Sequence, residues 1–105
     1  MGATVKDMVD NSIKENEFVI FGKSWCPYCK RAKAIMEDLT DQLMYIDIDK
    51  TDKESEIQAY LHQLNGQGTV PHVYIRQKFI GGCSDLQAIP GAKLKEMVKG
   101  SKAKA

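Results

Sequence analysis

The chain has 105 residues, of which 43% are hydrophobic, and this suits one compact domain with an ordinary core. Fifteen basic and fourteen acidic residues leave a net charge of +1, and no basic run is dense enough to predict nucleic-acid binding. The longest apolar runs are strand-sized, far short of the roughly 20 residues that span a bilayer. We therefore expect a single soluble domain over residues 1–105 that binds neither nucleic acid nor membranes.

The N-terminus carries no recognisable targeting signal. The segment Met1–Lys6 has no apolar region, and Lys6 stands where a myristoylation motif has Ser or Thr. Three cysteines, two of them in a Cys-x-x-Cys pair, do not resemble the framework of a secreted disulfide protein. A reducing compartment fits better, so a cytoplasmic location is predicted, although a transit peptide removed earlier would leave the same sequence.

Apolar periodicity predicts a βαβ unit in the first half of the chain. Residues 3–16 form an amphipathic helix and residues 17–21 a strand, while residues 43–49 read as a second strand with no hairpin turn before it. The segment between the two strands is amphipathic, so the strands should be parallel with a right-handed crossover. Its apolar residues at helical spacing are Ala32, Ile35, Met36 and Leu39.

The second half predicts a helix, a hairpin and a last helix. Residues 52–65 form a helix that Asn65-Gly66 ends, and residues 72–75 and 78–80 form an antiparallel hairpin around Arg76-Gln77. Gly81-Gly82 then breaks the second strand, Ser84-Asp85 starts a helix, and Pro90-Gly91 interrupts it before a last helix. A short N-terminal segment and residues 100–105 are predicted to fray. The expected core-facing residues of the helix over 52–65 are Ile57, Tyr60, Leu61 and Leu64.

The stretch Cys26-Pro27-Tyr28-Cys29 lies between the first strand and its helix. Cys26 should stand at the helix start, where free N–H groups and the helix dipole favour an anion, and Pro27 suits the first turn. With Lys23 as a nearby cation, this position should lower the Cys26 pKa from its ordinary value of about 8.5. Cys29, one turn on, should be more buried. We therefore predict Cys26 as the attacking thiolate and Cys29 as the resolving thiol.

The same spacing also occurs in zinc sites. A structural zinc ion needs four ligands, and the chain has no second Cys-x-x-Cys or paired-histidine motif. His62, His72 and Cys83 are scattered single residues, and the two histidines are expected at the surface or in the hairpin. The sequence favours redox chemistry over a metal site.

Three motifs together make the chain resemble the dithiol glutaredoxins. They are Cys26-Pro27-Tyr28-Cys29, Thr69-Val70-Pro71 and Gly81-Gly82-Cys83-Ser84-Asp85, in that family's order and spacing. With the helices between them they cover nearly the whole chain. The resemblance implies an α/β thioredoxin fold, a four-stranded mixed sheet sandwiched between helices. It also implies glutathione as cosubstrate, with no bound cofactor and no metal.

The resemblance also implies a glutathione site. The proline matching Pro71 is cis in the family, and the backbone at Val70 pairs with the cysteinyl part of glutathione like an added strand. The start of the next helix and Asp85 hold the γ-glutamyl end. Lys23 and Gln63 match positions that meet the glycyl carboxylate, and Tyr28 flanks the sulfur. The implied glutathione-binding residues are Lys23, Tyr28, Gln63, Thr69, Val70, Pro71, Gly82, Cys83, Ser84 and Asp85.

Gly68 departs from the family pattern. Many relatives carry a basic residue immediately before Thr-Val-Pro, so its absence here should weaken glutathione binding by about 0.2–1 kcal/mol, the worth of an exposed ion pair. Cys83 can be read either as a packing residue beside the glutathione site or as a third oxidisable thiol. Thr69-Val70-Pro71 by itself could simply open an edge strand.

The expected activity is glutathione-dependent reduction of glutathione mixed disulfides and protein disulfides. Glutathionylated or disulfide-containing proteins would be the substrates, glutathione reductase the coupled system, and the protein a monomer. A thioredoxin-type reductase would have Gly-Pro between its cysteines and would not need Gly-Gly-Cys-Ser-Asp. A binding protein for a shared iron–sulfur cluster is the other alternative, and Pro27 argues against it because cluster-binding relatives usually have Gly or Ser there.

Overall fold

Strand β1 (Phe18–Gly22) is the centre of the fold, because its neighbours on both sides extend one sheet in the order β2-β1-β3-β4. The structure is a computed structural model that describes residues 4–103. Strand β2 (Leu43–Asp47) runs parallel to β1, while β3 (His72–Ile75) and β4 (Lys78–Gly81) continue the sheet in antiparallel pairs. This mixed four-stranded sheet confirms the predicted fold.

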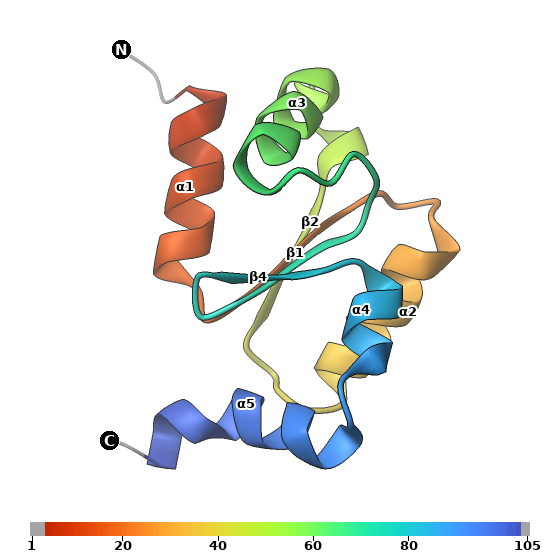
Figure 1. Ribbon diagram of the computed structural model, residues 1–105. Helices are drawn as coiled ribbons and strands as arrows, with labels where there is room; N and C mark the ends of the chain where they lie inside the picture. Colours follow the sequence, from red (N-terminus) through yellow and green to blue (C-terminus); the bar gives the residue numbers. More distant parts are fainter. Residues whose placement is uncertain (1–3, 104–105) are drawn as a thin grey trace.

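Helices cover both faces of the sheet (Figure 1). Helices α1 (Val5–Glu15) and α3 (Glu54–Asn65) lie on one face. The other face carries α2 (Pro27–Glu37), α4 (Cys83–Ala88) and α5 (Gly91–Ala103). Among residues 4–103, no helix is both long and apolar enough to cross a membrane.

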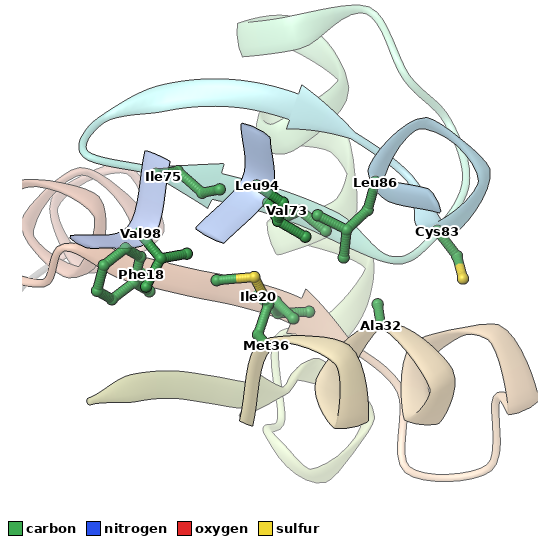
Figure 2. Packing of buried hydrophobic residues seen from close by; sticks show 10 residues of the cluster. All are labelled: Phe18, Ile20, Ala32, Met36, Val73, Ile75, Cys83, Leu86, Leu94 and Val98. Carbon is green, nitrogen blue, oxygen red and sulfur yellow. The ribbon is translucent and has the colours of Figure 1, made fainter. Parts of the chain in front are cut away.

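Strand β1 is buried on both sides, since alternate residues point to opposite faces. Phe18 and Ile20 belong to the core under α2, α4 and α5, while Val19 and Phe21 belong to the core under α1 and α3. Figure 2 shows the first of these cores, with Ile20 beside Met36 of α2 and with the Cys83 side chain at the edge nearest the start of α2. The all-apolar run of β1 is therefore a consequence of its central place.

Two expectations for the middle of the chain are wrong. The strand predicted over residues 43–49 ends at Asp47, where the short 3₁₀-helix η1 (Ile48–Lys50) turns the chain, closed by Thr51, which donates twice to the Ile48 carbonyl. Leu64 is 44% exposed instead of core-facing. The Asn65 side chain faces the sheet, since its amide donates to Tyr74 Oη. Neighbouring residues of a helix lie about 100° apart around its axis, so Leu64 points away from that contact toward solvent.

The hairpin and the last helices follow the predicted order with shifted ends. Gly81 still belongs to β4, and α4 begins at Cys83, one residue earlier than predicted. Helix α5 continues to Ala103, so the segment 100–105 expected to fray begins inside a helix, and residues 104–105 lie outside the described part of the chain.

Candidate active site

Cys26 is the N-cap of α2, and Pro27 takes the first helical position. The Cys26 Sγ accepts a hydrogen bond from the Cys29 N–H at 3.3 Å, so the sulfur occupies the place of a capping oxygen. Both thiols are free. The Cys26 residue is 6% exposed, whereas Cys29 is completely buried. The more accessible sulfur at a helix N-terminus is the better placed of the two to attack a disulfide.

The Cys29 thiol lies beneath Cys26 against the end of β1. Its Sγ accepts a hydrogen bond from the Lys23 N–H at 3.5 Å. Burial, and then the neighbouring Cys26, raise the pKa of Cys29 to about 12. At neutral pH Cys29 is therefore a thiol, which suits a group that waits for a partner rather than one that attacks first.

The loop between β1 and α2 is held to η1 by Asp49. Its carboxylate accepts hydrogen bonds from the Ser24 N–H at 2.9 Å and from Ser24 Oγ at 2.6 Å. These bonds lower the Asp49 pKa below its ordinary value. Asp49 therefore fixes the approach to the active-site helix.

Two aromatic side chains stand exposed on either side of the cysteines. Trp25 is 65% exposed and Tyr28 61% exposed. Each has a cation near its ring, with Lys23 Nζ 5.6 Å from the Trp25 centroid and the Arg31 guanidinium 5.8 Å from that of Tyr28. Apolar area this large beside a reactive sulfur suits contact with a substrate.

A cleft of about 400 Å³ opens beside Tyr28. The Val70–Pro71 peptide bond on its wall is cis, as the resemblance implies. The Gln67 amide nitrogen bridges this segment, donating to the Thr69 carbonyl at 2.7 Å and to the Pro71 carbonyl at 2.8 Å. The cleft is lined by Tyr28, Gln67, Thr69, Val70, Pro71, Gly82, Cys83, Ser84 and Asp85.

The start of α4 forms the opposite wall. The Asp85 carboxylate accepts a hydrogen bond from the Gly82 N–H at 2.9 Å, and both Ser84 and Asp85 are exposed. Cys83 is 4% exposed, and burial raises its pKa. A side chain on Gly81 would overlap the Asp85 carboxylate, so this position in the turn requires glycine.

The cleft gathers eight of the ten residues that the resemblance implies, and Lys23 and Gln63 lie elsewhere. Within residues 4–103, neither of them lines the cleft. Lys23 Nζ binds Glu54 Oε2 at 3.1 Å, so its charge is already paired. Gln63 follows the buried Leu61 by two positions, or about 200° around α3, and it lines a separate pocket between α1 and α3.

Gln67 is the cleft residue that the sequence reading missed. It lies between Gly66, whose φ of 81° ends α3, and the cis-proline segment that it bridges. Its position two residues before Thr69 could have indicated this role, because a long amide side chain that close can bind the carbonyl groups of the same loop.

No metal site competes with this arrangement in the part of the chain that the structure describes, since no three His, Cys, Asp or Glu residues gather there to hold an ion. His72, expected at the surface or in the hairpin, lies in β3 and is 1% exposed. Its Nδ1 contacts the Asn65 amide nitrogen at 3.1 Å, and burial lowers its pKa to about 4. The neutral His72 is therefore a core residue and lies outside the cleft.

Comparison with known proteins gives consistent matches. A family model described as glutaredoxin matches residues 18–80. Glutaredoxin-1 of Rhizophagus irregularis is 39% identical over 84 residues, covering 80% of this chain and 83% of that protein. Glutaredoxin-1 of Homo sapiens is 42% identical over 87 residues, covering 80% and 82%. The crystal structure of a buckwheat glutaredoxin–glutathione complex superposes with a TM-score of 0.85 at 33% identity, over 91% of this chain and 88% of that one.

A Cys-x-x-Cys dithiol at the head of a helix, on a mixed four-stranded sheet, defines a thiol–disulfide oxidoreductase of the thioredoxin fold. Together with the family match and the relatives at about 40% identity, this places the protein more narrowly. The chain belongs to the glutaredoxin family. The family resemblance and the oxidoreductase class predicted from the three motifs are both confirmed.

Proposed function

We propose that the protein reduces glutathione mixed disulfides and protein disulfides with glutathione as its cosubstrate. The observation that carries this proposal is the cleft beside Tyr28, which joins the cis-Pro71 segment to the start of α4 next to the Cys26 helix. A tripeptide thiol needs such an extended groove leading to a reactive sulfur. The glutathione complex of the buckwheat relative supports the same ligand here.

Glutathione would lie across the cleft with its sulfur toward Cys26. The backbone at Val70 pairs with its cysteinyl group, as an added strand would. The N-terminus of α4 binds the γ-glutamyl carboxylate, and the exposed Asp85 attracts its ammonium group. Lys23 would contact the glycyl carboxylate only by releasing Glu54, and Gln63 only from outside the cleft, so Gln67 is the nearer amide for this role.

The first half-reaction needs Cys26 alone. Its thiolate attacks the glutathione sulfur of a mixed disulfide; a Cys26–glutathione disulfide forms, the bond between the glutathione sulfur and the substrate sulfur breaks, and the substrate leaves as a thiolate that takes a proton from solvent. A second glutathione thiolate then attacks the glutathione sulfur on Cys26. Cys26 thiolate is restored, and oxidised glutathione leaves.

Protein disulfides would need Cys29 as well. Cys26 attacks the substrate disulfide and forms a mixed disulfide with it, and Cys29 then attacks Cys26 and displaces the substrate thiolate. The Cys26–Cys29 disulfide that results is reduced by two glutathione molecules. We further propose a cytoplasmic monomer that works with glutathione reductase on glutathionylated or disulfide-containing proteins.

The test is turnover of a small glutathione mixed disulfide, coupled to glutathione reductase, for the wild type, Cys26→Ser and Cys29→Ser. The wild type and Cys29→Ser should turn over, and Cys26→Ser should lose at least about a thousand-fold because the attacking sulfur is gone. A wild type that shows no glutathione-dependent turnover refutes the proposal. Visible absorbance after anaerobic reconstitution with iron and sulfide would instead support the cluster-binding alternative.

A further inference from the structure

The hydroxyl of Tyr45 and the thiol of Cys29 lie on either side of Gly22, beneath the active-site surface. Strands β1 and β2 pair Gly22 with Asp47, which brings Tyr45, two residues earlier, to the same face of the sheet. A Cβ added to Gly22 would lie 2.6 Å from Tyr45 Oη and 3.0 Å from Cys29 Sγ. Oxygen and sulfur therefore both border the small space that the missing side chain leaves.

This arrangement matters because Cys29 must become a nucleophile while buried. Its raised pKa leaves Cys29 almost entirely as the thiol at neutral pH. A hydrogen-bond donor aimed at the sulfur stabilises the thiolate more than the thiol, because bonds to charged groups are the stronger ones. Among its side-chain neighbours, the Tyr45 hydroxyl acts in this direction and lowers the Cys29 pKa, whereas Cys26 raises it.

Tyr45 is suited to remain a donor throughout the reaction. Burial, with the negative charges that Cys29 and Asp47 can carry, raises its pKa above the ordinary value for tyrosine. The hydroxyl is therefore protonated at every pH at which the enzyme would work. From the α2 side, Lys33 Nζ lies 4.9 Å from the ring centroid of Tyr45, so a cation also faces this group.

We propose that Tyr45 is a positioning residue for the resolving step, its hydroxyl donating to Cys29 Sγ as that sulfur attacks Cys26. This inference rests on the proposed function, specifically on its dithiol route. In that step the Cys29–Cys26 bond forms and the Cys26–substrate bond breaks, so Cys29 is oxidised and the substrate sulfur is reduced. The proton of Cys29 passes to solvent, the departing substrate thiolate takes one up, and the proton of Tyr45 stays in place.

The direct test measures Cys29 itself. In a Cys26→Ser background, the alkylation rate of Cys29 is followed against pH with and without Tyr45→Phe. Removing the hydroxyl should raise the Cys29 pKa by about one unit and slow alkylation at neutral pH about ten-fold. Asp47 and Lys33 are present in both proteins, so their effects cancel in the comparison. Tyr60→Phe is the matched control, since it removes a hydroxyl bound to Asp10, far from the thiols, and should change neither value.

The second readout is the ratio of protein-disulfide turnover to mixed-disulfide turnover, which Tyr45→Phe should lower about ten-fold. Gly22→Ala provides an independent variant, because its methyl group would lie 2.6 Å from Oη and 3.0 Å from Sγ, must displace at least one of them, and should lower the same ratio. An unchanged Cys29 pKa in Tyr45→Phe overturns the proposal, as does equal slowing of both turnovers. Failure of the glutathione assay in the wild type would refute the proposed function instead, and the alkylation result would still decide the role of Tyr45.

Discussion

Cys26 and Cys29 are three residues apart, yet they meet opposite environments. Cys26 lies at the first free N–H groups of α2, while Cys29 is inside the helix and fully buried. Sequence alone predicts this division, because a helix start after a strand fixes which of the two sulfurs faces outward. The two roles therefore follow from local backbone geometry.

Burial of His72 predicts that the protein loses stability in mild acid. Its pKa of about 4 in the folded state lies below the ordinary value of 6.5, so the unfolded chain binds a proton first as the pH falls. The contribution of neutral His72 is complete above pH 6.5 and is lost progressively between pH 6.5 and about 4, by about 3 kcal/mol in all. Urea unfolding at several pH values across this window measures the slope.

The variant His72→Asn, which does not titrate, should flatten that slope. His62→Asn should change the slope only slightly, because the His62 charge is the smaller of the two causes that lower the His72 pKa. If wild type and His72→Asn lose stability in parallel between pH 6.5 and 4, the buried histidine is not the cause.

The residues that sequence reading did not find are those whose role depends on contacts between distant segments. Tyr45 is one apolar-looking position in a strand, and nothing near it in the sequence indicates Cys29. Gln63 fits the family's spacing, but rotation around α3 turns it away from the cleft, whereas Gln67 reaches it from the following loop. Local patterns predict which motif is reactive, and packing decides which side chains surround it.

Among the helices, strands and turns, the structure differs from the prediction mainly at the turns. The apolar run over residues 43–49 has no break that marks η1, because Ile48 is fully buried although the strand has ended. The polar pair Arg76-Gln77 predicts a turn correctly, but its conformation is unusual for these residue types. Arg76 has φ 47° and Gln77 φ 69°, both in the left-handed region, as a type I′ hairpin turn requires.

Gln77→Gly should therefore stabilise the hairpin. Glycine adopts positive φ without steric cost, and Gln77 is exposed, so the expected gain is about 0.5–1 kcal/mol in the free energy of unfolding. Arg76→Gly provides the contrast, because the Arg76 guanidinium donates to the Val98 carbonyl at 2.9 Å and stacks 5.7 Å from the Phe18 ring centroid. Arg76→Gly should destabilise the protein, although it too removes the steric cost of a positive φ. Unfolding in guanidinium chloride measures the stability of both variants. If both have a lower free energy of unfolding than the wild type, this account of the turn is contradicted.

The whole molecule is two cores joined through β1. The helices α1 and α3 cover one, and α2, α4 and α5 cover the other, yet both rest on alternate residues of the same strand. The candidate site spans the second of these layers, with α2 bringing the thiols and α4 one wall of the cleft. The order of motifs along the chain predicts this layered fold well, because each apolar stripe needs a sheet face to cover.

A shared central strand predicts that the two cores unfold together. Val9 of α1 and Val98 of α5 are both buried and lie on opposite faces of the sheet. Each change to alanine should cost about 1–3 kcal/mol, lowering the Tm by roughly 4–8 °C for each kcal/mol in a domain of this size. The double variant should lose the sum of the two, since the sites share no contacts, and calorimetry should still record one transition. Separate transitions in either variant would mean that β1 does not couple the faces, and the active-site layer could then open while the α1 layer stays folded.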